Sequence, residues 1–224
     1  MEGGLAQQLK QEAREAPGGA RADAILDAAE LVFASSGYEG AALREIAERA
    51  GVAQGLIHYH FNNKARLFER MVARRSGQIN AARAERLAQL RSKGALRLEE
   101  IVEALFRPTI ETGLELAEDG GGFARILVSM ANSNDPLAQE MTETYYDPIA
   151  HDYIAALQES EPGLARADAV WAYMFAIGVG MTMMAKTGRP KRLSNGLCDD
   201  GDADAMLARI VPFICGGVRA LVTP

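Results

Sequence analysis

The sequence predicts an all-α fold, and three observations support this assignment. Apolar residues recur at helical spacing along almost the whole chain of 224 residues. No stretch keeps the apolar–polar alternation of a strand for more than a few residues, and there is no internal repeat. Residues 42–61 read as two short helices joined by a glycine turn. We therefore expect a three-helix N-terminal domain and a larger C-terminal helical domain, with about nine helices in total.

The first helix is expected over residues 21–36, after an arm without an apolar face. Residues 1–20 contain two glycine pairs and a proline, so we expect a disordered arm there. Gly37 can end the helix that follows. The buried stripe of that helix is formed by Ile25, Ala29, Val32 and Phe33.

Residues 42–61 predict a helix-turn-helix. Leu43, Ile46, Ala47 and Ala50 give the first short helix one apolar face. Gly51 can take the positive φ that ends this helix. A second short helix follows from about residue 53, and such a helix can enter the major groove of DNA.

The outer face of this second helix suits a nucleic-acid surface. Gln54 can bond the edge of adenine in a bidentate manner. His58, Tyr59 and His60, with Lys64 just beyond, can reach phosphate oxygens.

The segment from Arg21 to Val72 resembles the TetR family of bacterial transcriptional regulators. The residues that carry the resemblance are Ile25–Ala29, Phe33, Gly37–Tyr38, Arg44, Ile46–Ala47, Ala50–Val52, Gly55, Ile57–Phe61, Lys64 and Leu67. The resemblance implies that residues 21–68 bind DNA, with Arg44 on a base. Gly55 would let the backbone approach DNA, and Leu56 could contact a thymine methyl group.

The chain departs from the family pattern where many relatives have Thr or Ser. At those positions it carries Ala41 or Ala42, Ala53 and Leu56 instead. Each lost hydroxyl removes about 1 kcal/mol of helix capping, together with a phosphate contact.

Residues 69–224 continue the helical pattern. Asn63 can cap a helix from Lys64 to about Arg91. Beyond it, Pro108 should kink or break one helix, and Pro148 should interrupt another that opens at Asp135–Pro136. Residues 189–201 are expected to be a loop.

The resemblance implies that this larger domain dimerises through its last two helices. Residues 169–185 form a run without a charge that we interpret as a helix buried on all sides, rather than a membrane anchor. The homodimer would place two reading helices on an inverted-repeat operator in double-stranded DNA. The predicted interface residues are Ile177, Gly178, Met184, Ile210, Phe213 and Gly217.

The resemblance also implies a cavity in this domain for an unknown small-molecule effector, mainly apolar, that releases the protein from DNA. Flexible methionines and aromatic rings suit such a cavity, although each residue could equally be ordinary core. The predicted lining consists of Phe106, Phe123, Leu127, Met130, Tyr145, His151, Trp171, Met174, Phe175 and Met181. One alternative is a DNA-binding dimer that needs no ligand.

Composition and charge limit the functional classes to which the protein could belong. The net charge is −6, but residues 21–75 carry eight Lys or Arg against seven Asp or Glu, so the DNA-binding part is the least acidic. Two cysteines and three histidines form no metal-binding pattern, and no catalytic or phosphate-binding motif is present. We expect no metal, no cofactor and no enzyme, with a helical enzyme or lipid carrier as a distant rival. No secretory signal is visible, so we expect a cytoplasmic protein.

Overall fold

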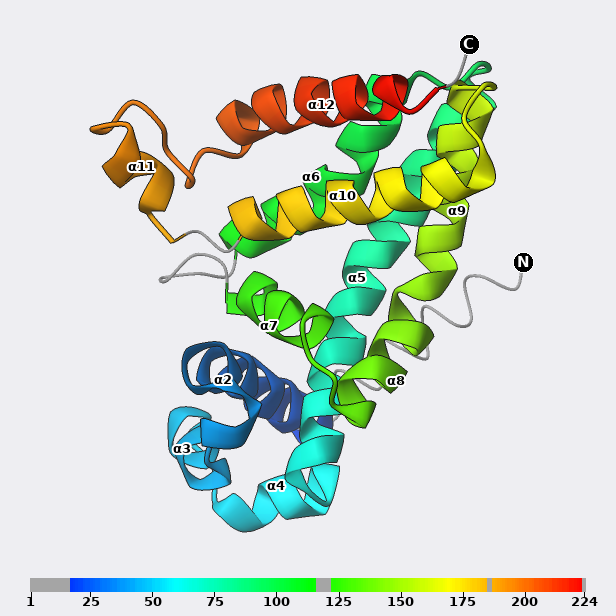
Figure 1. The fold of residues 1–224 in the computed structure, drawn as a ribbon. Helices are drawn as coiled ribbons and strands as arrows, with labels where there is room; N and C mark the ends of the chain where they lie inside the picture. Colours follow the sequence, from blue (N-terminus) through cyan, green and yellow to red (C-terminus); the bar gives the residue numbers. More distant parts are fainter. Residues whose placement is uncertain (1–16, 116–121, 185–186, 223–224) are drawn as a thin grey trace. The chain divides into compact units, whose positions relative to one another are not determined.

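The structure is a computed structural model that describes residues 17–115, 122–184 and 187–222, with side chains for residues 19–111, 122–183 and 187–222. These residues form eleven helices, α2 to α12, and no strand (Figure 1). The all-α prediction is confirmed. The chain divides into two compact units, the first ending at Arg74 and the second beginning at Arg75.

The first unit contains three helices and the start of a fourth. They are α2 (Pro17–Gly40), α3 (Leu43–Arg49), α4 (Gln54–Phe61) and the first turns of α5 (Lys64–Ser92). Its core is apolar, with Ile25, Ile46 and Ile57 fully buried. Because α2 begins at Pro17, residues 17–20 are helical rather than part of a disordered arm. The rest of the predicted arm, residues 1–16, lies outside the described residues.

Two glycines shape the first unit as the sequence predicts. Gly37 has φ 70° and ψ 174°, so the regular part of α2 ends there. Gly51 has φ 65° and follows α3. A side chain would strain both positions, because L-residues rarely adopt positive φ.

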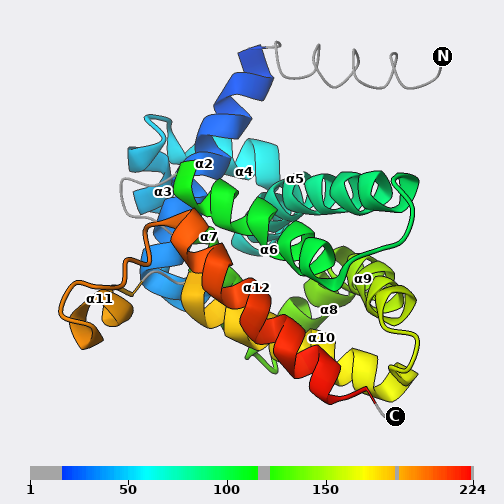
Figure 2. The ribbon, with the colours of Figure 1, turned by 90° about the horizontal axis from the view of Figure 1, so that it is seen from above.

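The second unit contains the rest of α5 and seven further helices. Their bounds are α6 (Leu98–Glu115), α7 (Gly122–Ala131), α8 (Pro136–Tyr145), α9 (Asp147–Ser160), α10 (Arg166–Met184), α11 (Arg189–Leu193) and α12 (Ala203–Ala220). Both α10 and α12 pack against α6 and against each other, and both views show α12 running alongside α10 (Figures 1 and 2).

Two boundaries differ from the prediction, and one is confirmed. The helix α6 continues through Pro108 to Glu115 and does not break. The predicted interruption at Pro148 is confirmed: α8 ends at Tyr145 and α9 begins at Asp147, with Pro148 in its first turn. The predicted loop 189–201 contains the short helix α11.

Two predicted caps are present. Asp135 accepts hydrogen bonds from the backbone N–H groups of Leu137 and Ala138, at 2.9 and 3.3 Å. Asn63 accepts one from the N–H of Arg66 at 2.9 Å. In both cases the side-chain oxygen accepts from backbone N–H groups in the first turn of a helix, which have no acceptor within the helix itself.

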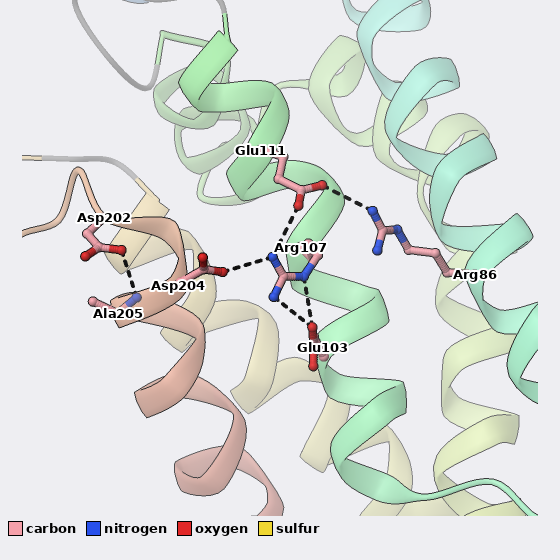
Figure 3. Close-up of polar contacts among 7 residues, drawn as sticks. All are labelled: Arg86, Glu103, Arg107, Glu111, Asp202, Asp204 and Ala205. Atoms are coloured by element: carbon pink, nitrogen blue, oxygen red, sulfur yellow. Dashed lines mark hydrogen bonds and ion pairs between the residues drawn. The ribbon is translucent and has the colours of Figure 1, made fainter.

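Arg107 on α6 is the centre of an ion-pair network (Figure 3). Its guanidinium donates to Glu103 at 2.9 Å, to Glu111 at 3.3 Å and to Asp204 on α12 at 3.1 Å. Arg86 on α5 donates to Glu111 at 3.2 Å. The network links three helices, although its partly exposed pairs each contribute at most about 1 kcal/mol.

Close approach between α6 and α10 depends on one glycine. Gly180 on α10 lies against the ring of Phe106, which is fully buried on α6. A Cβ atom at position 180 would lie 2.1 Å from Phe106 Cε1.

In the described residues, no helix combines the length and hydropathy needed to span a bilayer.

Candidate nucleic-acid interface

The turn between α3 and α4 is held by backbone hydrogen bonds. The N–H of Val52 donates to the carbonyl of Ala47 at 3.0 Å, and the N–H of Gly51 donates to that of Glu48 at 3.2 Å. This pattern, with positive φ at Gly51, is a Schellman motif. Ile57 and Phe61 then bury one face of α4, so the opposite face points outward.

The predicted contact residues of α4 lie on or beside that outer face. Gln54, Gly55, His58 and Tyr59 are exposed, and Tyr59 has 82% of its surface accessible. An aromatic side chain this exposed leaves most of its apolar ring in contact with solvent, which is typical of a recognition surface. Leu56 and His60 are half-buried, so they lie at the edge of this face.

The two histidines of α4 differ in what they contact. His60 packs edge-on against Tyr59, with 5.1 Å between ring centroids, and also contacts the ring of Phe61. His58 Nδ1 lies 2.9 Å from the carbonyl oxygen of Asn62, so this ring nitrogen is already engaged at the end of α4. Because a carbonyl only accepts, Nδ1 is the donor, and Nε2 of the neutral ring is an acceptor; His58 can donate to a phosphate only when the ring is protonated.

Gln54 opens the outer face at the N-terminal end of α4. Among the residues that the structure describes, its side-chain amide makes no hydrogen bond. The amide therefore keeps both its donor and its acceptor for a base edge.

Arg44 lies on α3 with its side chain 82% exposed. Its Nε donates to Glu48 at 2.8 Å, one helical turn away, and this hydrogen bond raises the pKa of Arg44. A pair this exposed is weak, so Arg44 can leave Glu48 for a base.

Lys64 at the start of α5 is only partly available. Its ammonium donates to the carbonyl of Glu39 at 3.0 Å and lies 4.9 Å from the centre of the Tyr38 ring. An ammonium has three donors, so two remain for a phosphate. Lys64 thus also holds the end of α2 against the start of α5.

The missing caps are evident in the structure. Ala42 and Ala53 occupy the N-cap positions of α3 and α4, and neither side chain makes a capping hydrogen bond. The first N–H groups of α4 are therefore donors that can bind a phosphate.

Comparisons with known proteins agree with this geometry. The family model of the tetracyclin repressor-like C-terminal domain matches residues 103–217, slightly more than half of the chain. The model of the bacterial regulatory proteins of the tetR family matches residues 25–71. The chain belongs to the TetR family.

Individual TetR relatives cover the chain to different extents. The transcriptional repressor BdcR of Escherichia coli is 25% identical over 166 residues, which are 73% of this chain and 78% of BdcR. The regulator TtgR of Pseudomonas putida is 41% identical over 68 residues, 30% of each chain. The higher identity is thus confined to a short part of the chain.

Solved structures of regulators have the same fold. The fatty acid degradation regulator FadR of Bacillus halodurans superposes with a TM-score of 0.66 at 19% identity, covering 89% of this chain and 96% of FadR. A TetR-like regulator from Rhodococcus sp. RHA1 gives a TM-score of 0.64 at 16% identity, with the same coverage. The two family models and the relative BdcR, rather than the shared fold, show that this protein is a DNA-binding transcriptional regulator and not an enzyme.

The predicted interface residues of the TetR dimer do not all lie on the surface. Gly178, Phe213 and Gly217 are exposed. Ile210 is instead buried in the chain's own core, and half-buried Ile177 packs against that core. The assignment of Ile210 to the interface is therefore corrected. The side chain of Met184 lies outside the described residues.

The predicted cavity residues also divide into two groups. Six are buried or half-buried in the second unit: Phe106, Phe123, Leu127, Met130, Tyr145 and Met181. Four are exposed and are corrected to surface positions: His151, Trp171, Met174 and Phe175. The last three lie on the outer face of α10, and the rings of Trp171 and Phe175 stack with centroids 5.7 Å apart. Because α10 is apolar on every side, helical spacing could not tell its inner face from its outer one.

Sequence reasoning did not identify one polar group in the interior of the second unit. Arg83 on α5 is 4% exposed and lies among Thr109, Tyr153 and Tyr173, which are also buried. A single arginine in a helix with many charged residues reads as a surface residue. The sequence did contain one indication that Arg83 is buried: it lies four residues from both Ile79 and Leu87, which are buried, and therefore on the same face of α5.

Proposed function

We propose that the protein is a cytoplasmic repressor that binds a palindromic operator as a homodimer and is released by a small, mainly apolar effector. The observation that carries the proposal is the outer face of α4, where Gln54, His58 and Tyr59 are exposed above a buried apolar face. Amide, imidazole and phenol groups are those that read base edges and bind phosphates.

A second copy of the chain is proposed to cover the outer face of α10 and α12. Trp171, Met174, Phe175 and Phe213 are 54 to 70% exposed there. Phe175 and Phe213 also line an open groove of about 240 Å³ with Gly217. Large apolar patches of this kind mark interaction sites, and a two-fold axis would let the same patch cover itself. Two α4 helices would then lie about 35 Å apart, one turn of DNA.

Repression and release by a ligand are proposed from the relatives. BdcR is named a transcriptional repressor, and FadR a regulator of fatty acid degradation. A ligand that binds the free dimer more tightly than the DNA-bound dimer must weaken DNA binding by the same factor. An apolar effector suits the buried aromatic and methionine side chains of the second unit.

Selection of DNA from random duplexes by the purified protein tests the DNA-binding proposal. We expect an inverted repeat with half-sites about one helical turn apart. Arg44→Ala should lower affinity for the selected duplex roughly tenfold to a hundredfold through the loss of a base contact. Enrichment of no sequence, or of a single unrepeated site, would contradict the proposal.

Sedimentation of two matched variants tests the dimer. Phe213→Asp puts a charge on the proposed face, and Leu193→Asp puts one on α11, where Leu193 is 75% exposed. We expect Phe213→Asp to sediment as a monomer at micromolar concentration and Leu193→Asp to remain dimeric. If both variants stay dimeric, the chains associate through another surface.

A further inference from the structure

Arg83 is a buried cation that is held by neutral groups. Its Nε donates to the carbonyl of Leu105 at 2.9 Å, and its Nη2 donates to the Thr109 hydroxyl at 2.9 Å. Its Nη1 donates to the side-chain oxygen of Asn80 at 3.2 Å.

The charge of Arg83 has no counterion among the residues that the structure describes. Within those ranges, no carboxylate lies at ion-pair distance from its guanidinium, which makes the three hydrogen bonds above. A guanidinium carries five N–H donors, so two of them are left for a further acceptor. A buried charge without a partner is costly, and buried charges in proteins are usually paired.

Two phenol hydroxyls near Arg83 are also without partners in the described part of the second unit. The hydroxyl oxygen of Tyr146 is fully buried and has no hydrogen-bond partner of normal geometry, and the Ser76 side chain lies near enough for a weak hydrogen bond that lowers the pKa of Tyr146. Tyr173 is buried, and its hydroxyl makes no hydrogen bond there either. By contrast, the hydroxyl of Tyr153 donates to the backbone carbonyl of Arg83 at 3.1 Å.

These phenols are hydrogen-bond donors at neutral pH. Burial raises the pKa of Tyr146, Tyr153 and Tyr173, while the positive charge of Arg83 acts in the opposite direction on all three. The hydroxyls are therefore protonated in the physiological range. The same interior holds a cation and two phenol O–H donors for which the described residues supply no hydrogen bond of normal geometry, and the hydroxyl of Tyr146 is fully buried.

We propose that Arg83, Tyr146 and Tyr173 form the binding site for a carboxylate group on the ligand of the second unit. A carboxylate has about four acceptor positions and can take the two spare guanidinium donors and both phenol hydroxyls. The inference rests on the proposed function, in which a ligand controls DNA binding, and it adds that the mainly apolar ligand is an acid.

The apolar surroundings fit the rest of such a ligand. Tyr153 and Tyr173 line an enclosed cavity of about 10 Å³ with Ile101, Leu157 and Ile214. This space holds about one water molecule, so a larger acid has to displace side chains. If ligand binding changes the packing of the second unit, the ligand has different affinities for the two packing states. Such a difference in affinity is what control of DNA binding by a ligand requires.

Binding of carboxylic acids to the purified full chain tests the proposal. The probes are octanoate and benzoate, with octanamide and benzamide as neutral controls of the same shape. We expect both acids to bind by isothermal titration and to raise the thermal midpoint, and the amides to bind at least about tenfold more weakly. Arg83→Gln should weaken binding of the acids roughly tenfold or more, since a hydrogen-bonded ion pair is lost.

Three tyrosine variants separate a ligand site from a structural role. Tyr146→Phe and Tyr173→Phe remove hydroxyls that have no partner, so the ligand-free midpoint should stay the same or rise, while acid binding weakens about fivefold. Tyr153→Phe is the control: its hydroxyl already donates to the backbone carbonyl of Arg83, so the ligand-free midpoint should fall and acid binding should change by less than about twofold.

Two results would overturn the proposal. One is that the amides bind as tightly as the acids, or that no acid from acetate to decanoate, nor benzoate, binds at all. The other is that Tyr146→Phe and Tyr173→Phe keep full affinity for the acids. Affinity for a selected operator duplex is measured in the same preparations. DNA binding without acid binding refutes only the acid site, and acid binding without DNA binding refutes only the proposed function.

Discussion

Replacing Gly180 with alanine should destabilise the second unit through a single contact. The added Cβ would lie 2.1 Å from Phe106 Cε1, 2.8 Å from Cδ1 and 3.0 Å from Cζ. Carbon atoms in contact lie roughly 3.5–4.0 Å apart, so the ring has to move by about 1.5 Å. Phe106 is fully buried, and the surrounding side chains leave the ring no open space.

The size of the effect follows from two opposing terms. Overpacking a core costs about 1–3 kcal/mol, and this overlap lies at the upper end. Alanine in place of glycine inside a helix stabilises by about 1 kcal/mol. The net loss should be about 2 kcal/mol, measured by urea unfolding at one fixed protein concentration, since association also affects stability.

Two further variants make the measurement decisive. Gly77 lies on an exposed part of α5 with open space at its Cβ position, so Gly77→Ala should stabilise the protein by about 0.5–1 kcal/mol. Adding Phe106→Leu to Gly180→Ala should recover at least about 1 kcal/mol relative to the sum of the single changes. A Gly180→Ala protein as stable as wild type would refute the packing argument.

Three other predictions concern caps, thiols and pH. Ala53→Ser should stabilise the first unit by about 1 kcal/mol, seen as a higher thermal midpoint, because α4 has no side-chain cap. Cys198 is exposed, whereas burial raises the pKa of the Cys215 thiol to about 11, so a thiol reagent at a pH of about 8 should modify only Cys198 until the protein unfolds. A hydrogen bond from Arg219 lowers the pKa of Glu99, so Arg219→Ala should destabilise the protein at neutral pH, and this difference should vanish as the pH falls below about 4.

The pH prediction follows from the direction of the Glu99 shift. A carboxyl whose pKa is lowered by folding stabilises the folded state at pH values above its unfolded pKa, about 4.3. That contribution is lost as the pH falls through the lowered pKa of the folded state. Equal destabilisation by Arg219→Ala at a pH of about 7 and of about 3 would show that the pair contributes nothing through ionisation.

The DNA-binding helices could be predicted from the sequence because local rules determine them. Gly51 sets the turn by its positive φ, and the apolar spacing around Ile57 decides which face of α4 is buried. The exposed face then follows without knowledge of the rest of the chain. Local signals also located the caps at Asn63 and Asp135.

The second unit was harder to predict because its packing is not local. Both faces of α10 are apolar, so only the packing of α12 and α6 decides that Phe175 faces outward and Tyr173 inward. Arg83 is buried because α6 supplies Thr109 and a backbone carbonyl at the right place. No spacing rule contains that information.

The most direct test of the account is a comparison of the DNA sequences selected by wild type and by Gln54→Ala. If the outer face of α4 reads bases, the variant should lose its preference at one base pair in each half-site, symmetrically, and keep the others. An unchanged selected sequence, or a loss of affinity that is equal for all sequences, would contradict a base-reading role for this helix.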